Sequence, residues 1–340
     1  MQQAVITGPK SLIFRDIPNS FEINKDEVLL RIKRIGVCGS NILVYHGEHP
    51  AVVYPVVQGH EFSAVVEHVG KDVKNIRPGM KATARPQLVC GQCPSCKRGH
   101  YNLCRHLKVQ GFQAPGVAQD YFIVPKKRVV PFSKNVTFDQ GAMIEPAAVG
   151  AHATGRVSSL RNKNVVVSGA GTIGNLVAQF AKSKGAQEVL ITDVVGYRLE
   201  TAKACGMEEI INVQKESFEE KVDEVFNGKG FQVGFEAAGV QASLDVLLKH
   251  IEKGSEIVIL GVYAENPRVN MFYLGKHELK VIGSLMYLHK DYADAVKVID
   301  SVEINLRPLI TNHFPFEKYD EAYRFIDQNK DEFMKVIIDM

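Results

Sequence analysis

Four cysteines lie within one fifteen-residue stretch whose spacing is that of a metal site. The stretch reads CGQCPSCKRGHYNLC, and its cysteines are Cys90, Cys93, Cys96 and Cys104. The two-residue gaps let neighbouring thiolates converge on one ion, and a longer loop brings the fourth. Four sulfurs close a tetrahedral Zn²⁺ shell and leave no position for water, so we expect a structural zinc. The spacing differs from that of ferredoxin clusters, in which a proline follows the last cysteine.

Three glycines between residues 165 and 193 have the spacing of a dinucleotide-binding turn. The stretch reads VVVSGAGTIGNLVAQFAKSKGAQEVLITD, which predicts a strand, a glycine turn, a helix and a second strand. In G-x-G-x-x-G the first glycine permits a tight turn, the second lets backbone approach a pyrophosphate, and the third lets helix and strand pack closely. The pyrophosphate would bind free N–H groups at the helix N-terminus. The predicted cofactor-binding residues here are Gly169, Gly171, Thr172, Ile173 and Gly174.

The acid that ends the second strand selects between the two nicotinamide cofactors. Asp193 follows Gly174 by nineteen residues, where its carboxylate can accept hydrogen bonds from the adenosine ribose. The same carboxylate would repel a 2′-phosphate, so we expect NAD rather than NADP. Arg198 lies close enough in sequence to favour NADP instead, although an exposed helix charge is the simpler interpretation of this arginine.

Further candidate metal ligands are scattered along the chain. They are Cys38 in GVCGSN, His60 and Glu61 in QGHEF, and Glu145 in MIEPAAVGAHA. A thiolate, an imidazole and a carboxylate make three zinc ligands and leave a fourth position for water or substrate, as a catalytic zinc requires. Each residue alone is ordinary. Their spacing does not join them, because they extend over more than one hundred residues.

Composition and charge describe a globular protein in the cytoplasm. The 340 residues are 45% hydrophobic and 23% charged, and the length favours two domains. No apolar run reaches membrane-spanning length, and the N-terminus MQQAVITGPK lacks the features of a secretion signal. The net charge is only +3, so charge does not indicate a nucleic-acid partner.

The chain divides into two regions with different sequence patterns. Up to about residue 148, short β-type runs such as EVLLRIKRIG and FSAVVEHVG are broken by Gly and Pro, which indicates a mostly antiparallel, barrel-like region. From residue 164 strands alternate with helices, and six strand-like runs predict a doubly wound parallel sheet. We therefore expect an α/β protein with a cofactor domain at residues 149–285. Residues 286–340 are expected to pack back on the domain of residues 1–148.

Taken together, these motifs resemble the zinc-dependent medium-chain dehydrogenase/reductase family over nearly the whole chain. The matching stretches, in the family's order, are GVCGSN, YPVVQGHEFSAVVEHVG, CGQCPSCKRGHYNLC, IEPAAVGAHA, GAGTIG and KHELKVIGS. The resemblance implies a GroES-like catalytic domain, a Rossmann domain, NAD, and one catalytic and one structural zinc. It implies that Cys38 and His60 ligate the catalytic zinc, with Glu61 or Glu145 as the third ligand. A glutamate at position 145 is similar to the sorbitol (polyol) dehydrogenase branch.

The implied reaction transfers a hydride from the carbon of a zinc-bound alkoxide to the nicotinamide, and the reverse. Ser40 would receive the alcohol's proton and pass it outward. The family often has CGSD with a histidine five residues after the cysteine, whereas this chain has Asn41 and Leu43 at those places. A leucine cannot carry a proton, so Tyr45, His46 or the ribose hydroxyls would replace the usual end of the relay.

The implied substrate is a hydroxyl-rich secondary alcohol: a polyol, cyclitol, sugar or sugar acid. The polar neighbourhood of Tyr45, His46 and Arg85 favours it, together with the glutamate at position 145. A sugar acid needs a cation, which Arg85 or His46 would supply. The alternative interpretation of Arg85 is a structural residue in a salt bridge.

Two other functions stay open at this point. One is a zinc-independent quinone-type reductase of the same fold that uses NADPH, against which Cys38, His60 and the cysteine cluster argue. The other is a non-enzymatic zinc-lobe protein that binds nucleic acid, since CKRGHYNLCRHLK is locally basic, although the charge is not sustained.

The family also implies a homodimer or homotetramer, with the apolar segment EIVILGVYAENPRVNMFYLG at the contact.

Overall fold

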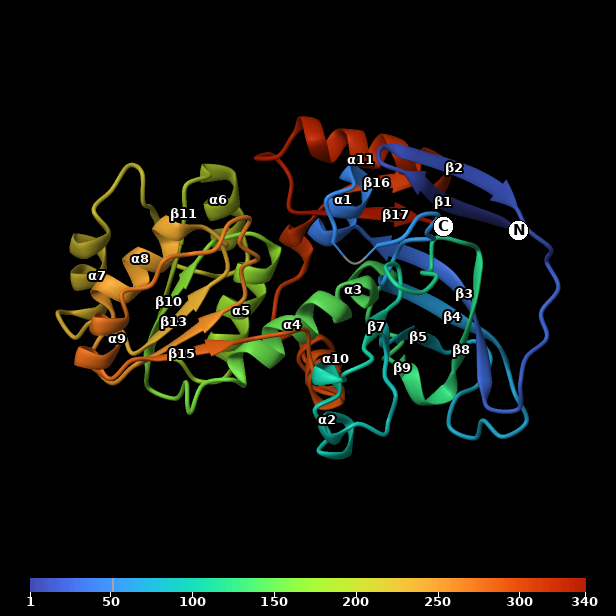
Figure 1. Cartoon of the computed structure of the whole chain (residues 1–340), viewed down its shortest axis with the longest axis horizontal. Helices are drawn as coiled ribbons and strands as arrows, with labels where there is room; N and C mark the ends of the chain where they lie inside the picture. The colour runs from blue at the N-terminus through green and yellow to red at the C-terminus, as the bar shows by residue number, and fades with distance from the viewer. Residues whose placement is uncertain (51) are drawn as a thin grey trace. The chain divides into compact units, whose positions relative to one another are not determined.

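The computed structural model describes residues 1–50 and 52–340, which form two compact units (Figure 1). Unit 1 contains Met1–Glu145, Leu288–Ser301 and Ile310–Met340, and unit 2 contains Pro146–Tyr287 and Val302–Leu309. The division at Glu145 and Tyr287 lies close to the expected boundaries at residues 148 and 285. The segment Val302–Leu309, which we expected in the catalytic domain, belongs to unit 2. Among the described residues, no helix combines the length and apolar character needed to cross a membrane.

Unit 1 is built on a seven-stranded sheet that includes the last two strands of the chain. The strands run in the order β16-β17-β3-β4-β5-β9, with β8 also paired to β3. Their bounds are β3 (Glu27–Gly36), β4 (Glu61–Val69), β5 (Lys81–Ala84), β8 (Tyr121–Pro125), β9 (Val129–Pro131), β16 (Ile310–Pro315) and β17 (Lys335–Asp339). All pairs are antiparallel except β16 with β17. The mostly β first domain is therefore confirmed, and β16 and β17 from the tail of the chain belong to its sheet.

Smaller elements surround this sheet. They are the hairpin β1 (Gln2–Gly8) and β2 (Ser11–Asp16), the short pair β6 (Gln87–Leu88) and β7 (Lys108–Val109), and the helices α1 (Gly39–His46), α2 (Pro94–Lys97), α3 (Phe138–Ala142), α10 (His289–Asp300) and α11 (Tyr319–Gln328). Helix α11 packs on β16 and β17, beside which it is drawn in Figure 1. Its buried Ala322, Tyr323 and Ile326 join one continuous core with the alternating apolar residues of β3 and β4.

Unit 2 contains the predicted six-stranded parallel sheet, in the order β12-β11-β10-β13-β14-β15. The bounds are β10 (Asn164–Ser168), β11 (Glu188–Asp193), β12 (Glu209–Asn212), β13 (Val233–Glu236), β14 (Glu256–Ile259) and β15 (Lys280–Gly283). The first strand along the chain lies in the middle, and the strand order reverses beside it. Dinucleotides bind at this reversal, at the carboxyl ends of the strands.

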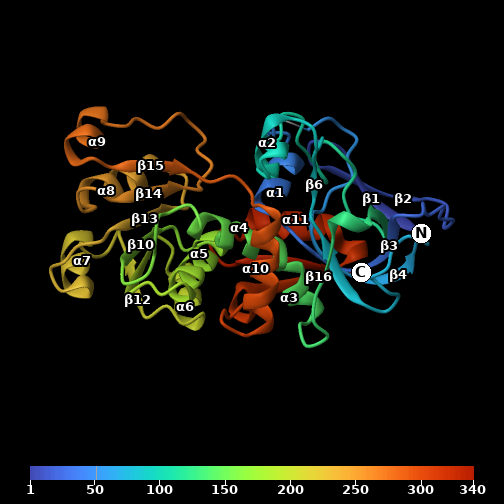
Figure 2. The same ribbon diagram turned by 90° about the horizontal axis from the view of Figure 1, so that it is seen from below.

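Helices cover both faces of this sheet because successive strand residues point to opposite sides. Val165 and Val167 pack with α4 (Ile144–Thr154), α5 (Thr172–Ser183) and α6 (Gly196–Ala204), as expected for one apolar layer. Val166 packs on the other face with α7 (Phe218–Phe226) and α8 (Gln241–His250). Figure 2 shows α5 and α7 on opposite sides of β10. The remaining helix, α9 (Met271–His277), has no buried residue.

Candidate metal centres and cofactor-binding turn

The four clustered cysteines meet at one point of unit 1. Their sulfurs all lie within 4.8 Å of one another, and those of Cys90 and Cys104 are 3.6 Å apart. Two sulfurs bound to one tetrahedral zinc at about 2.3 Å lie about 3.8 Å apart, so the donor set fits this ion. Hydrogen bonds from the backbone N–H groups of Arg105 and Cys96 lower the pKa of Cys93 to about 6, which favours the thiolate that binds metal. All six cysteines of the chain are free thiols.

This cysteine lobe packs on helix α10 through an aromatic pair. The ring of Tyr101 stacks on that of His289, with centroids 4.0 Å apart and planes 11° apart. Burial, together with the charge of Arg85, lowers the pKa of His289 to about 4, so the stacked imidazole is neutral near pH 7. The Arg85 guanidinium donates to the carbonyl of Lys127. Arg85 therefore lies beside the lobe, and its substrate role stays a prediction.

A second cluster joins residues that are far apart in sequence. Cys38 precedes α1, while His60 and Glu61 stand at the start of β4. The sulfur of Cys38, an imidazole nitrogen of His60 and a carboxylate oxygen of Glu61 all lie within 4.8 Å of one another. The His60 Nδ1 is buried and has no hydrogen-bond partner in the described part of the chain. A thiol, a carboxylate and a buried imidazole with an unused nitrogen make a donor set that fits zinc.

Helix α1 holds Cys38 at this cluster. The side chain of Asn41 accepts a hydrogen bond from the Cys38 N–H at 3.0 Å, and Gly47 ends the helix in the left-handed conformation with φ of 83°. The Ser40 hydroxyl donates to the Cys38 sulfur at 3.1 Å. Burial raises the pKa of the Cys38 thiol, and the charge of Glu61 raises it further, while Lys335 and Ser40 oppose them.

Lys335 is a member of this site that sequence reasoning missed. Its ammonium, at the start of β17, donates to both carboxylate oxygens of Glu61 at 2.6 and 2.9 Å, and to the Val37 carbonyl at 3.1 Å. Both side chains of the ion pair are buried. Burial by itself would lower the pKa of Lys335, but the charges of Glu61 and Cys38 outweigh burial and raise it. The cluster therefore contains one positively charged group, the Lys335 ammonium, next to the Glu61 carboxylate and the Cys38 sulfur.

The remaining predicted residues of unit 1 have partners of their own. Glu145 is buried at the start of α4 and contributes to the raised pKa of Lys335, but it does not join the 4.8 Å cluster. Tyr45 lies in the core, where it stacks on Tyr323 and donates to Asp320 at 2.9 Å. His46 contacts Asp327 on α11 at 2.9 Å. The ligand, relay and substrate roles of these residues stay predictions.

The spacing of residues in the sequence also does not predict an aromatic contact beside His60. The ring of Phe112 tilts against His60 with centroids 5.1 Å apart, and it stacks on His49 with centroids 4.8 Å apart. Burial lowers the pKa of His49, as does the nearby His60. Nothing in the spacing of these residues marks them, because Phe112 reaches the cluster from a loop about fifty positions further along the chain.

The glycine turn of unit 2 has the geometry of a phosphate-binding loop. Gly169 has φ of 103°, and a Cβ on Gly174 would lie 1.8 Å from the Gly169 carbonyl oxygen, so both positions require glycine. A Cβ on Gly171 would meet no atom within 4 Å. The open space at Gly171 lies where helix α5 begins with Thr172 and Ile173, and anions bind at such helix N-termini. The turn therefore fits a dinucleotide pyrophosphate.

Asp193 ends β11 beside this turn, as the sequence predicts. One of its carboxylate oxygens accepts a hydrogen bond from the Ala170 N–H at 2.7 Å. The other accepts from the N–H groups of Val194 and Val195 at 2.8 and 2.9 Å. The Arg198 guanidinium lies 3.8 Å from the same carboxylate. The acid is thus held at the glycine turn, and the nearby arginine neutralises part of its charge.

Comparisons with known proteins agree with this geometry. Residues 24–134 match the alcohol dehydrogenase GroES-like domain, and residues 172–301 match the zinc-binding dehydrogenase domain. The chain is 30% identical to the L-threonine 3-dehydrogenase of Protochlamydia amoebophila, over 98% of this chain and 97% of that one. It is 28% identical to the sorbitol dehydrogenase of Bacillus subtilis, over 99% and 97%. An alcohol dehydrogenase structure from E. coli CFT073, complexed with NADH, superposes with a TM-score of 0.91 at 29% identity, covering 100% and 99%.

Proposed function

Because this chain belongs to the zinc-containing medium-chain alcohol dehydrogenase family, we propose that it transfers a hydride between a secondary alcohol of a polyol, sugar or sugar acid and NAD, giving the ketone. The observation that carries this proposal is the cluster of the half-buried Cys38 with the buried His60 and Glu61. A cluster of three protein ligands is typical of a catalytic zinc, whereas the four-cysteine lobe is typical of a structural one.

Different residues of the chain would have different roles in this reaction. When bound, zinc supplies a Lewis acid that makes an alcohol more acidic, and NAD supplies the hydride acceptor. Cys38 and His60 would hold the metal, with Glu61 or Glu145 completing the set. The Ser40 hydroxyl, 3.1 Å from the Cys38 sulfur, is placed to take the alcohol proton. Leu43 cannot pass that proton on, so its exit from Ser40 differs from the usual histidine relay.

The cofactor residues support NAD over NADP. Asp193 is buried at the glycine turn, where an additional phosphate on the ribose would meet its carboxylate. Arg198 lies 3.8 Å away and reduces this repulsion without replacing the acid. NAD is therefore the proposed cofactor, bound by the turn at Gly169, Gly171 and Gly174.

A substrate screen tests the proposed function directly. Purified, zinc-loaded protein is incubated with polyols, aldonates, sugar phosphates, L-threonine and small primary alcohols, with NAD or NADP. We expect NAD reduction, followed at its ultraviolet absorbance, to be fastest with a hydroxyl-rich secondary alcohol and at least about 10-fold slower with NADP, since a repulsion of about 1.4 kcal/mol already corresponds to a factor of ten. Turnover of small primary alcohols alone would show that the polyol assignment is wrong.

The exposed edge of unit 2 supports a homo-oligomer as part of this proposal. Strand β15 ends the sheet, and its Val281 is 43% exposed. Beside it in sequence, Met271 and Phe272 on α9 are 71% and 77% exposed. An unpaired strand edge with apolar neighbours is a surface that proteins normally cover. Pairing of this edge with a second copy across a two-fold axis would cover it.

Replacing Phe272 by aspartate, together with Val281→Asp, is expected to produce monomers. Each added carboxylate would have to be buried without a partner in the proposed contact. Light scattering would give at least twice the chain mass of 37.7 kDa for the native chain and the single mass for the variant. Tyr197→Asp, an exposed position on α6 at the other side of the sheet, serves as the control and should leave the mass unchanged. A native chain that elutes as a monomer would refute the oligomer.

A further inference from the structure

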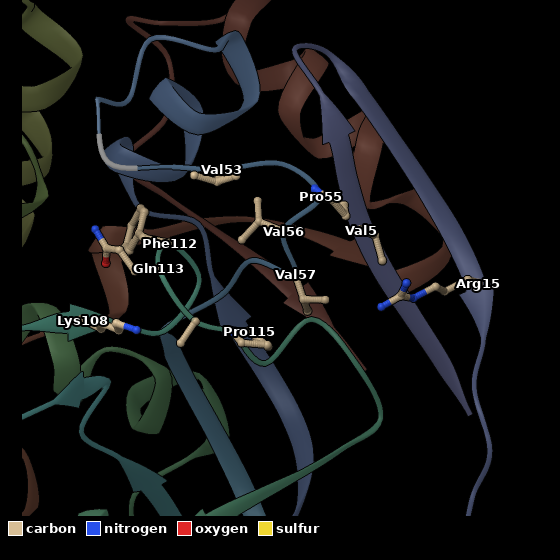
Figure 3. A pocket seen from close by; sticks show the side chains of 11 residues that line it. Val5, Arg15, Val53, Pro55, Val56, Val57, Lys108, Phe112, Gln113 and Pro115 are labelled. Carbon is tan, nitrogen blue, oxygen red and sulfur yellow. The ribbon is translucent and has the colours of Figure 1, made fainter.

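Unit 1 contains a cavity of about 340 Å³ between the β1–β2 hairpin and two loops. Figure 3 shows its apolar wall, formed by Val5, Val56 and Val57, with Phe112 at one side. Small-molecule sites begin at about 300 Å³ and combine apolar walls with a few polar groups. The size therefore suits part of a small organic molecule.

The charged groups of this cavity are all of one sign. Lys108 and Arg15 line it and approach from opposite sides in Figure 3, and its lining contains no acidic residue. The guanidinium of Arg15 donates to the neutral Gln3 side chain, with Nε at 2.7 Å. Within residues 1–50 and 52–340, Lys108 has no ion pair. The Gln113 carbonyl oxygen accepts from the Val109 N–H at 2.9 Å, which leaves the amide NH₂ of this lining residue as a further donor. These groups recognise an anion.

Phe112 lies between the cavity and the candidate catalytic cluster. Its ring forms part of the lining and also tilts against His60, with centroids 5.1 Å apart. Val57, on the apolar wall, precedes His60 by three residues in the segment that enters β4. The Phe112 side chain thus lies between His60, a proposed metal ligand, and a cavity that has apolar walls and two basic side chains.

We propose that this cavity takes the anionic end of the substrate, so that the preferred substrate is a polyol chain with a terminal carboxylate or phosphate. Phe112 would lie along the carbon chain, and Lys108 and Arg15 would determine specificity by binding the anion. This inference rests on the proposed function, because it assumes that the other end of the same molecule reacts at the cluster of Cys38, His60 and Glu61.

The test compares neutral and anionic polyols on the zinc-loaded full chain. The probes are sorbitol, gluconate and sorbitol 6-phosphate, and the readouts are kcat/KM with NAD and binding by calorimetry. We expect one anion to exceed sorbitol by at least about 10-fold in the native chain. The double variant Lys108→Gln with Arg15→Gln should lose about 10- to 100-fold toward that anion and stay within about 3-fold toward sorbitol. The anion that responds distinguishes a carboxylate from a phosphate.

Matched variants separate the charge effect from a folding defect. Lys108→Arg keeps the charge and should keep the preference, and Lys71→Gln, at an exposed position outside the lining, should change nothing. Equal binding of all three probes, or a loss shared by sorbitol, would overturn the cavity assignment while leaving a dehydrogenase in place. Charge-dependent binding without oxidation of any polyol would instead remove the proposed function and keep the anion site.

Discussion

Replacing Cys38 by serine is expected to lower kcat/KM for alcohol oxidation by at least about 10³-fold while leaving NADH affinity within about 2-fold. A serine hydroxyl stays protonated near pH 7 and cannot replace a thiolate in the zinc shell. The Lewis acidity lost with the metal is worth several kcal/mol, and each 1.36 kcal/mol is a factor of ten in rate. The glycine turn belongs to the other unit, so NADH titration followed by its fluorescence should be unaffected.

Metal content separates this result from a general defect. Elemental analysis should give two zinc ions per native chain and about one for Cys38→Ser, because the lobe of four cysteines is untouched. Cys205→Ser is the matched control, since Cys205 is also a free thiol, is buried, and lies outside both clusters. A Cys38→Ser variant that keeps both its zinc and its activity would show that Cys38 is not a ligand, whereas one that loses a zinc ion but keeps its activity would favour the zinc-independent reductase.

The fold and the local motifs could be predicted because each depends on residues close in sequence. The cysteine lobe needs only the spacing of four thiols, and the turn at Gly169 needs only one strand, one turn and one helix. The six parallel strands follow from alternating apolar runs, and all six are present. In these cases the residues that form the sequence pattern are the same residues that contact one another in the structure.

The candidate catalytic cluster is different, because no local pattern joins its members. Cys38 and His60 were connected only through resemblance to a family, and the structure brings them together where α1 and β4 begin. No sequence pattern predicts the role of Lys335, because its partner Glu61 lies 274 positions away. The pairing of β17 with β3 brings Lys335 to Glu61. Phe112 and its cavity likewise depend on how loops fold around the sheet.

The largest expected effect on stability comes from this same lysine. Replacing Lys335 by methionine should lower the free energy of unfolding of the metal-free protein by about 3–5 kcal/mol, because it leaves the buried Glu61 carboxylate without its ion-pair partner. The native contact is 2.6 Å long between side chains that are 5% and 2% exposed. Urea unfolding followed by circular dichroism measures the difference. Lys335→Arg, which keeps the charge, should recover part of the loss.

A surface ion pair in the same unit provides the comparison. Lys318 lies 3.2 Å from Glu321, but their side chains are 55% and 49% exposed, so Lys318→Met should cost less than about 1 kcal/mol. The pKa of Lys335 is raised above 10.5, so its contribution should be complete below about pH 10 and decrease only as the pH rises through the higher folded-state value. Equal losses for the two lysines would mean that the buried pair of Lys335 and Glu61 contributes no more to stability than the exposed pair. The positive charge of Lys335 would then have no role in keeping the candidate metal ligands together, and the cluster would depend on packing alone.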